Sequence, residues 1–559
     1  MTFSVWAPAP EKVQVRVDGH DHDMTRDGDW WRSDVTGTDY AFVIEGKAYP
    51  DPRSLWQPNG VHEASRVYSH DFEWSDHAWT GRALPGGVIY ELHIGTFTAG
   101  GTFDAAIEKL DHLVDLGVTH VEVMPVNSFD GTHGWGYDGV LWGAVHEPYG
   151  GPDGFKRFVN ACHVRGLAVL LDVVYNHLGP SGAHLDRFGP YFAGRNDWGP
   201  GLNLDGPDSD EVRRYVIDNA LQWLRDFHVD GLRLDAVHAL VDRRAVHLLE
   251  ELAVEVEALS AHVRRPLTLI AESDLNDDRL VTAREGGGFG LHAQWSDDLH
   301  HCLHVALTGE TFGYYADFAA PDALRGTLED VFFHAGTWSS FRGKHHGKPV
   351  DRRLPGHRFL GYLQNHDQIG NRATGDRLTA SVSHERLLVA AAIVFASPYT
   401  PMIFMGEEWA ATTPWQFFAS FPDPELAEAV RTGRRREFAR HGWGESEVPD
   451  PMDPATFERS RLDWAEPAAH ASYLETYKAL IALRRTHPEL ADPRLDSFVV
   501  SEHASCFVLH RGALRVIANL GASSSVHEDI EVLLASPSVS VSGSTVTVPS
   551  DAFAVVRSM

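Results

Sequence analysis

The sequence predicts an α/β protein, a (β/α)8 TIM barrel flanked by an N-terminal β-sandwich and a C-terminal β-sandwich. Eight strongly apolar runs alternate with amphipathic stretches between Val88 and Glu408, which is the pattern of parallel strands covered by helices. Both ends of the chain instead carry short alternating stretches separated by turn residues, as small antiparallel sandwiches do. A chain of 559 residues has room for this arrangement.

The first part, residues 1–85, has the pattern of a small sandwich. The stretches FSVWA, VQVRVDG, WWRSDV and YAFVIEG alternate apolar and polar residues, and Pro, Gly and Asp separate them. Paired aromatic residues such as Trp30 and Trp31 suit the core of such a unit better than a glucan surface. We expect residues 51–63 to form an ordered connector.

Residues 86–487 are predicted to form the barrel. Its strands are expected in the runs VIYELHIGTF (88–97), VTHVEVMPV (118–126), LAVLLDVVYNH (167–177), GLRLDAV (231–237), LTLIAES (267–273), the weaker AQWSDD (293–298), RFLGYLQNHD (358–367) and PMIFMGEE (401–408). Apolar positions every three or four residues predict helices over 104–117, 153–166 and 210–227. The loop 178–209 and the segment 336–347 are the expected insertions at the barrel rim.

Residues 488–559 return to short alternating stretches. These are FVVSEH, CFVLHRG, LRVIANLG, VSVSGSTVTV and AFAVV, and they predict the second sandwich. The chain shows no internal repeat and no low-complexity tract. The expected order along the chain is therefore sandwich, barrel, sandwich.

The strong negative charge limits the classes of partner. The chain has 48 Lys and Arg against 78 Asp and Glu, a formal charge of −30, so nucleic acid and anionic membrane surfaces would be repelled. The longest apolar run, residues 387–405, contains Pro398 and Pro401 and ends against Glu407. A helix followed by a buried strand explains this run better than a membrane span. We therefore expect no nucleic-acid partner and no membrane partner.

The cysteines Cys162, Cys302 and Cys506 lack the close spacing of a zinc site or a disulfide framework, so we expect reduced thiols in the core. The opening stretch MTFSVWAPAPEKVQV has no basic segment followed by an apolar run, and no export signal is expected. Together these features predict cytoplasmic residence.

Acidic residues close four of the predicted strands, the third, fourth, fifth and seventh. They are Asp172, Asp235, Glu272 and Asp367. A helix cap or a loop ion pair would explain any one of them alone, but four at carboxyl ends meet at the rim where barrel enzymes carry their active sites. Arg233, His177 and His366 lie at the same strand ends. The sequence therefore predicts a catalytic site at this rim.

The chemistry of this set is narrow, because no HEXXH, GXSXG or phosphate-loop motif accompanies it. Two facing carboxylates, one ionised and one protonated, cleave glycosides through a covalent sugar intermediate. Asp235 lies two residues beyond Arg233, whose guanidinium can keep it ionised as the nucleophile. Glu272 follows the apolar LTLIA, where desolvation would raise the pKa of its carboxyl, so we expect it to act as acid and later as base.

Further residues are expected to hold the sugar ring that reacts. Asp367, beside His366, would bind the hydroxyls of the distorted ring and support its positive charge. Trp135 and Tyr137, in GWGYDGV, would offer a stacking face for that ring. The chain shows no clear metal-ligand cluster and no cofactor fingerprint, so we expect no cofactor and no calcium.

The blocks DVVYNH, DGLRLDAVH, IAES and QNHD resemble the four signature regions of the α-amylase superfamily, glycoside hydrolase family 13, in order and on the expected strands. The likeness covers nearly the whole chain, including a leading sandwich of starch-binding type. It implies that Asp235 is the nucleophile, Glu272 the general acid and base, and Asp367 the transition-state stabiliser. It also implies a supporting set of substrate-binding residues, namely Arg233, Asp172, His177, His366 and Tyr137.

Within that superfamily, IAESDLND, QNHDQIGNR, GYDGVLW and FMGEEWAATTPWQFFASFPDPE are similar to blocks of the members that act on maltooligosyltrehalose. The resemblance implies hydrolysis of the α-1,4 bond between a maltooligosyl chain and a terminal trehalose, with release of trehalose during its biosynthesis. It also implies α-1,4-glucans as related ligands and a functional pairing with a maltooligosyltrehalose synthase.

The leaving side, where trehalose would sit, has weaker candidates. Asp274 and Asn276 would bond trehalose hydroxyls or merely cap the helix that follows. The aromatic candidates for its wall are Trp409, Trp415, Phe417 and Phe418, which a structural role explains nearly as well. His238 is followed by alanine where many amylases have Lys-His, so its role on the leaving side stays open. Gln368, next to Asp367, completes the expected substrate-binding set.

Two other functions remain open. A branching-enzyme-type α-glucan transferase shares the leading domain and a related GYD block, whereas SDLND after Glu272 and the WAATTPWQFF block favour the hydrolase. A non-catalytic glucan-binding protein on the same barrel is the alternative from another class. The retention of three central carboxylates argues against it.

Overall fold

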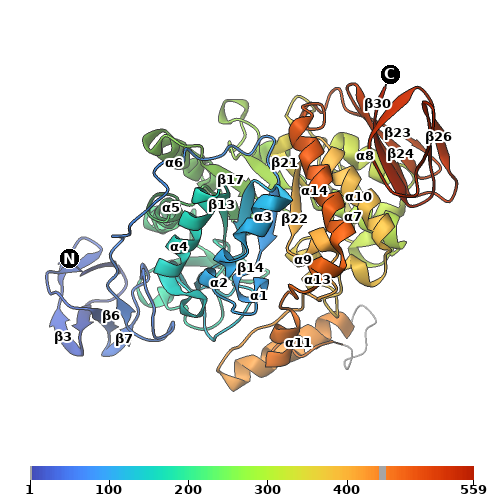
Figure 1. Ribbon diagram of the computed structural model, residues 1–559. Coiled ribbons are helices and arrows are strands. Elements are labelled where there is room, and N and C mark those ends of the chain that lie inside the picture. Colours follow the sequence, from blue (N-terminus) through green and yellow to red (C-terminus); the bar gives the residue numbers. More distant parts are fainter. Residues whose placement is uncertain (1–2, 440–447, 559) are drawn as a thin grey trace.

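The computed structural model describes residues 3–439 and 448–558. Its centre is a closed barrel of parallel strands in the order β9, β10, β13, β16, β17, β18, β21 and β22 (Figure 1). Their bounds are Ile89–Leu92, His120–Val123, Ala168–Val173, Gly231–Leu234, Thr268–Ala271, Ala293–Trp295, Phe359–Tyr362 and Thr400–Phe404. Each of the predicted runs therefore contributes one strand, and the predicted barrel is confirmed.

The strands are shorter than the runs that predicted them. Strand β16 ends at Leu234 and β17 ends at Ala271, although the runs continue to residues 237 and 273. The backbone then leaves the sheet, and Ala236 takes a left-handed conformation with φ 42°. The acidic residues that follow the strands thus lie in tight turns at the mouth of the barrel.

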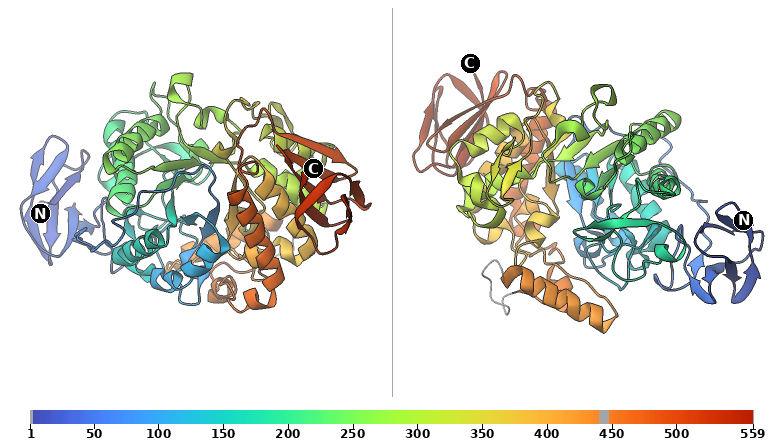
Figure 2. Two further views of the ribbon diagram at one scale, coloured as in Figure 1. Left: turned by 45° about the horizontal axis from the view of Figure 1, so that its top comes forward. Right: turned by 180° about the vertical axis from the view of Figure 1, so that it is seen from behind.

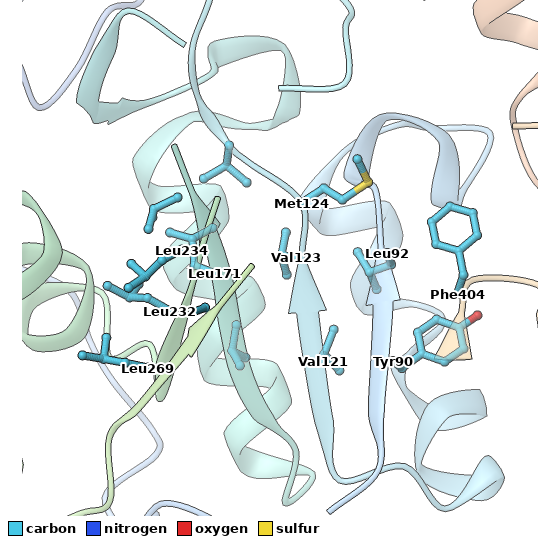
Figure 3. Close-up of a cluster of buried hydrophobic side chains, with 14 of the residues drawn as sticks. Tyr90, Leu92, Val121, Val123, Met124, Leu171, Leu232, Leu234, Leu269 and Phe404 are labelled. Carbon is cyan, nitrogen blue, oxygen red and sulfur yellow. The ribbon is translucent and has the colours of Figure 1, made fainter. Parts of the chain in front are cut away.

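Inward-facing residues change character along the strands. The start of the barrel interior is filled by an apolar cluster that includes Ile89, Leu170, Ile270, Leu360 and Met402. Two positions further on, the same faces carry Glu91 on β9 and Asp172 on β13, because side chains alternate with a period of two along a strand. Outward-facing residues such as Val121 and Leu232 belong to the main hydrophobic core, part of which Figure 3 shows. The barrel therefore has an apolar floor and a charged mouth.

Helices cover the outside of the barrel. The long ones are α4 Gly151–Val164, α5 Ser209–Asp226, α6 Leu248–Val263, α7 Asp297–Thr308, α10 His384–Ala396 and α14 Ala471–Thr486. The run 387–405 forms most of α10 and then β22, as expected, and no helix of residues 3–439 and 448–558 is long and apolar enough to span a bilayer. The helix expected over 104–117 is instead two helices, α2 Phe103–Ile107 and α3 Leu110–Leu116, because each half buries its own apolar residues.

Antiparallel sheets lie on opposite sides of the barrel (Figure 2). The N-terminal sheets have the orders β1-β5-β4 and β3-β2-β6-β7, with β8 beside β6. Their strands are β1 Phe3–Trp6, β2 Gln14–Val17, β3 His20–Asp23, β4 Thr25–Asp27, β5 Trp30–Ser33, β6 Asp39–Ile44, β7 Lys47–Tyr49 and β8 Ser65–Arg66. The indole Nε1 of Trp31 donates to the carbonyl of Ala7 in this interior, so Trp31 is a packing residue.

The C-terminal sheets have the orders β23-β24-β25-β30-β27 and β26-β29-β28. Their strands are β23 Val499–His503, β24 Cys506–Arg511, β25 Leu514–Asn519, β26 Ser525–His527, β27 Ile530–Ala535, β28 Ser540–Ser542, β29 Thr545–Val548 and β30 Ala552–Ser558. Strand-rich units at both ends agree with the predicted fold class. The division of the chain at residues 85/86 and 487/488 stays a prediction.

The expected insertions contain short hairpins. The loop 178–209 carries β14 Phe192–Asn196 and β15 Gly199–Leu202, and the segment 336–347 carries β19 Thr337–Ser339 and β20 Lys344–His346. A further helix, α11 Pro424–Ala439, follows β22. Figure 1 shows α11 apart from the barrel helices, on the same side as α1 Ile94–Phe97 and α9 His366–Gly370, which follow the carboxyl ends of β9 and β21.

Candidate active site

Backbone hydrogen bonds of the barrel hold the two central acids in place. The amide N–H of Asp235 donates to the carbonyl of Val173, and that of Glu272 donates to the carbonyl of Leu234. The ladder between neighbouring strands therefore continues one residue past the ends of β16 and β17. Both side chains start from a rigid sheet, which suits residues that need precise placement.

One guanidinium faces three carboxylates at this point. Arg233 is fully buried, and its Nη1 donates to both oxygens of Asp172 at 2.8 Å. The same nitrogen donates to Asp235 Oδ1 at 2.7 Å, while Nη2 lies 3.5 Å from Glu272 Oε2. The indole ring of Trp295 lies 4.2 Å from the guanidinium carbon. Arg233 thus brings the carboxyls of Asp235 and Glu272 to one spot.

Both carboxylate oxygens of Asp235 accept hydrogen bonds. Arg233 occupies Oδ1, and the side-chain Nδ2 of Asn176 donates to Oδ2 at 2.6 Å. Charged and amide donors on both oxygens fix the orientation of the carboxylate. The side chain of Asp235 is therefore held in one direction at the mouth of the barrel.

Glu272 has the opposite electrostatic environment. Burial raises the pKa of its carboxyl, and although Arg233 opposes the change, the charges of Asp235 and Asp367 add to it, so the pKa is about 8. The amide N–H of Ala236 donates to Oε2. At neutral pH this carboxyl carries a proton, which it can give to a leaving oxygen.

Asp367 lies on the first turn of α9, whose N-terminus is capped by the side chain of Asn365. Its Oδ1 accepts from the side chain of Asn371 at 3.2 Å and lies 3.6 Å from Nε2 of His366. Its side chain is 38% exposed, more than those of Asp235 and Glu272 at 13% and 17%. Asp367 therefore keeps free oxygen surface that can bind sugar hydroxyls.

His366 and Tyr137 link the acids through the floor of the site. Nδ1 of His366 bonds Glu91, and its Nε2 lies 2.8 Å from the Tyr137 hydroxyl, which donates to Asp172 Oδ2 at 2.6 Å. Burial opposes charging of the His366 ring, but the carboxylates of Glu91 and Asp367 outweigh it and raise the pKa of His366 to about 9. His366 is thus a cation that offsets part of the negative charge at the mouth.

The aromatic residues expected to stack on sugar have partners inside the protein. The ring of Tyr137 stacks on His366 at 5.2 Å, and the ring of Trp135 stacks on Trp415 at 5.4 Å. Both still line the cavity. Each ring exposes to the cavity only the surface that its aromatic partner leaves uncovered, so neither ring offers a whole free face for stacking on a sugar.

A cavity of about 360 Å³ joins these residues, large enough for part of a glucan chain. It contains all three predicted catalytic acids. Its lining is Trp135, Tyr137, Asp138, His177, Trp198, Asp235, Ala236, Glu272, His366, Asp367, Asn371, Phe417 and Arg434.

Several residues of this site were missed by sequence reasoning. Glu91 places a charge inside the apolar run 88–97, just as charged residues do in DGLRLDAVH. The same sequence signal that led to Asp235 could therefore have found Glu91. Asp297, in the weak sixth run, accepts from Tyr362 and from Gln368 Nε2, the latter at 3.2 Å. Burial, aided by the charge of Asp367, raises the pKa of Asp297 to about 6. Gln368 itself is buried, and its side-chain amide donates to Asp297.

Trp198 was also missed, because it lies in the insertion and has no strand pattern around it. It comes from the β14–β15 hairpin and is half exposed. The ring of His177 stacks against it at 6.2 Å, and the ring of His238 meets it edge-on at 5.9 Å. Nδ1 of His238 accepts from the amide of Asp274 at 3.3 Å. His177 and His238 therefore lie around one exposed aromatic ring.

The structure does not bring Asn276 to the cavity. Its side chain is buried, and its Nδ2 donates to Asp298 Oδ2 at 2.9 Å and to the carbonyl of His334 at 3.2 Å. Its backbone has φ 53°, a conformation that asparagine tolerates better than most residues. Asn276 is therefore a turn residue. The carboxylate of Asp274 is half exposed and paired with Arg342.

Trp409 and Trp415 do not form a wall of the cavity. Both are fully buried. Trp409 packs on Trp464 and its Nε1 reaches Glu466 at 3.3 Å, while Trp415 backs Trp135. Phe418 is buried as well, and Phe417 alone of this aromatic block lines the cavity. A sequence rich in aromatic residues shows no preference for cavity over core, and here the core takes most of them.

Within residues 3–439 and 448–558, no group of three or more His, Cys, Asp or Glu side chains is placed to hold a metal ion. The three cysteines are free and buried.

A protonated carboxyl and a second carboxyl around one guanidinium, at the mouth of a (β/α)8 barrel, define the class of glycoside hydrolases. A family model described as "Alpha amylase, catalytic domain" matches residues 66–189. The chain is 57% identical over 533 residues to malto-oligosyltrehalose trehalohydrolase of Arthrobacter ramosus, covering 93% of this chain and 92% of that one. It is 44% identical to the enzyme of the same name from Saccharolobus solfataricus, covering 87% and 85%.

Solved structures support the same family and fold. A crystal structure of a putative alpha amylase from Salmonella typhimurium matches all of this chain and 97% of its own, with a TM-score of 0.91 and 38% identity. The pullulanase of an Anoxybacillus species, with a TM-score of 0.73 and 18% identity, shares the fold. The chain belongs to the malto-oligosyltrehalose trehalohydrolase family, a branch of the α-amylase glycoside hydrolases.

Proposed function

We propose that this protein hydrolyses the α-1,4-glucosidic bond next to the terminal trehalose of maltooligosyltrehalose, with retention of configuration, and releases trehalose. The observation that carries the proposal is the pair of acids that Arg233 brings together. Asp235 accepts from Arg233 and Asn176 on its two oxygens, while Glu272, with a pKa of about 8, keeps its proton at neutral pH.

In the first step, an oxygen of Asp235 attacks the anomeric carbon of the glucose unit that precedes trehalose. The bond from that carbon to the glycosidic oxygen breaks, and Glu272 gives its proton to this oxygen, so trehalose departs with both electrons of the broken bond. The positive charge on the distorted ring is met by Asp235 and by Asp367, whose exposed oxygen surface faces the same cavity.

In the second step, the Glu272 carboxylate takes a proton from water, and the water oxygen attacks the same anomeric carbon. The bond to Asp235 breaks, which frees the shortened glucan and regenerates both carboxyls in their starting states. Arg233 and Asn176 remain on Asp235 throughout and stabilise it as a leaving carboxylate. Two inversions at one carbon give net retention.

The printed names of the relatives support this substrate, since enzymes 44–57% identical over most of the chain are named malto-oligosyltrehalose trehalohydrolases. The proposal extends to a functional pairing with a maltooligosyltrehalose synthase, because that reaction class supplies the substrate, and to residence in the cytoplasm, where such glucans are made. Asp172, His177, His366 and Tyr137 are proposed to support the reacting ring.

Chromatography of the products on maltotriosyltrehalose tests the proposal. We expect trehalose and maltotriose in equal amounts, with the new reducing end first formed as the α-anomer. The Asp235→Asn variant at the same concentration should release less than about a thousandth as much, because the nucleophile is removed. Glucose as the first product from wild-type protein, or a β-anomer, would contradict the proposal.

The alternative is a branching transferase, which passes the glucan to a glucan hydroxyl and not to water. A 1,4-alpha-glucan branching enzyme of Corynebacterium jeikeium is 26% identical over 74% of this chain and 62% of its own, far below the trehalohydrolases. Incubation with amylose decides between the two, since new branch points without trehalose from maltotriosyltrehalose would favour the transferase. Glucan binding without any new product would favour a non-catalytic protein.

A further inference from the structure

An arginine from outside the barrel enters the active-site cavity. Arg434 lies on α11 and lines the cavity together with Asp367, Asn371 and Phe417. Its side chain is 10% exposed, so its charge is largely withdrawn from water. Desolvating an arginine is costly unless its N–H groups are used, and the proposed two-step reaction gives Arg434 no task.

Local contacts fix the position of this guanidinium. Nη2 of Arg434 donates to the carbonyl of Gly370 at 2.5 Å, and Nη1 donates to Glu437 Oε2 at 3.1 Å. Its guanidinium carbon lies 5.0 Å from the ring centre of Phe417 and 4.5 Å from that of Phe438. Such packing limits rotation and pre-orients the donors.

Gly370 connects Arg434 to the catalytic helix. It is the last residue of α9, which begins with His366 and Asp367. A Cβ atom at Gly370 would lie 2.1 Å from the ring of Trp135, so only glycine lets α9 approach that wall. The place of Arg434 relative to Asp367 is therefore set by a short, tightly packed path.

The guanidinium has more N–H donors than Gly370 and Glu437 accept. The remaining donors belong to a side chain that lines the cavity. Sugar hydroxyls are good acceptors for a charged donor, and a bond of this kind is stronger than one between neutral groups. The ligand that suits Arg434 is a glucose unit and not a phosphate, since Glu437 and Asp367 lie close to the cation.

The direction of the bound glucan in the cavity follows from the position of Glu272. Because Glu272 must reach the oxygen that leaves with trehalose, trehalose lies on the side of β16 and β17, near His238 and Trp198. The rest of the glucan then extends to the opposite wall, which α9, Phe417 and α11 form. Arg434 stands on that wall.

We propose that Arg434 is a specificity-determining residue that donates hydrogen bonds to the second glucose unit on the non-leaving side, one unit before the ring that Asp235 attacks. This inference rests on the proposed function, because Glu272 as general acid sets the direction of the chain. It makes α11 part of the substrate site and explains why this helix is anchored to α9.

The test compares substrates that differ by one glucose unit. Glucosyltrehalose fills only the position of the attacked ring, whereas maltosyltrehalose also fills the position assigned to Arg434. For Arg434→Met we expect kcat/KM to fall about 10- to 100-fold with maltosyltrehalose, the loss of bonds to a charged donor, and less than about threefold with glucosyltrehalose. Arg436→Met, on the exposed face of the same helix, should leave both values unchanged.

An equal loss with both substrates, or no loss with either, would overturn the assignment. Thermal unfolding of each variant separates a folding defect from a binding defect, and Arg434→Lys, which keeps the charge but not the geometry, should show the same dependence on chain length if Arg434→Met unfolds. A wild-type protein that releases no trehalose from either substrate would contradict the proposed function instead. Calorimetric titration of maltose and glucose into wild type and Arg434→Met would then decide whether Arg434 binds the second unit.

Discussion

Arg233 shows how one buried charge can hold two carboxyls in different surroundings. It donates directly to Asp235 at 2.7 Å but lies 3.5 Å from Glu272. Asn176 adds a second donor to Asp235, whereas Glu272 is dominated by burial. The raised pKa of Glu272 suits the acid of the proposed reaction, and the two donors on Asp235 suit an oriented nucleophile.

The raised pKa of Glu272 predicts a cost in stability. With a folded pKa of about 8 against a usual value of 4.5, the folded protein binds a proton that the unfolded chain releases, so the stability that Glu272 contributes is full below about pH 4.5 and is lost as pH rises toward 8. We expect Glu272→Gln to unfold at a higher temperature than wild type at pH 8, with the difference shrinking toward pH 4.5.

The same substitution should lower kcat/KM about 100- to 10,000-fold, because the amide cannot donate the proton. In wild type, kcat/KM should fall as pH rises through about 8, and this basic limb should be absent from the variant. Calorimetric melting curves and pH–rate profiles measure the two effects. A variant less stable than wild type at pH 8, or a basic limb that persists, would contradict this reading of Glu272.

At the residue scale, charge at strand ends was the informative signal. It led to Asp172, Asp235, Glu272 and Asp367, which the structure places around one cavity or directly beneath it. The aromatic block after β22 was misleading, because Trp409 and Trp415 are fully buried. Aromatic type alone does not say whether a loop residue faces cavity or core, since that depends on contacts between distant segments.

At the element scale, an ionic cluster fastens the segment that precedes β9 to the amino-terminal face of the barrel. His163 on α4 lies 2.8 Å from both Asp76 in this segment and Asp230 just before β16. Trp79 stacks on His163 and donates to Asp230 at 2.8 Å. Burial opposes charging of His163, but Asp230 and Asp76 outweigh it and raise its pKa. The strand pattern gave no sign of this cluster, because its members are far apart in the chain.

We expect His163→Gln to lower the free energy of unfolding by about 1–3 kcal/mol near pH 6, because buried Asp230 and Asp76 lose a charged hydrogen-bond donor, while Arg265 and His228 still pair with them. The pKa of His163 is raised above 6.5 in the folded protein, so the contribution is full below that pH and is lost as pH rises through the folded value. The gap between variant and wild type in urea unfolding should therefore narrow as the pH rises above 6.5.

A matched control is Arg165→Met, which removes a pair with Asp111, a carboxylate that is 83% exposed. Exposed pairs of this kind contribute less than about 1 kcal/mol. Equal losses from the two substitutions would show that the cluster is no stronger than a surface ion pair.

At the scale of the whole molecule, the spacing of apolar residues and the order of the segments along the chain were enough to predict a barrel between two strand-rich units. Eight runs became eight strands of one closed sheet. How the units attach was not predictable, because the contacts join residues that lie far apart in the chain. Arg386 on α10 is such a link. It donates to the carbonyls of Ala306 and Leu307 in the last turn of α7, to that of Leu520, and to Asp551 Oδ1 at 2.5 Å.

We expect Arg386→Met to loosen the C-terminal sheets from the barrel and lower stability by about 1–3 kcal/mol, since several buried acceptors lose their donor. Limited proteolysis after residue 487 should become faster, while kcat stays unchanged because the acids that we propose as catalytic lie on other elements. Arg494→Met is the control, because Arg494 is 69% exposed and pairs with Asp492, two residues before it in the chain. Unchanged proteolysis of Arg386→Met would contradict this role.

The central claim is that Asp235 forms the covalent bond to the sugar, and mass spectrometry of the trapped intermediate tests it most directly. The Glu272→Gln variant should form the glycosyl-enzyme from an activated 5-fluoro maltosyl fluoride but hydrolyse it slowly. Peptide mapping should then place one maltosyl adduct on Asp235, and Asp235→Asn should carry none. An adduct on Asp172, Asp297 or Asp367 instead, or a labelled Asp235→Asn protein, would contradict the account.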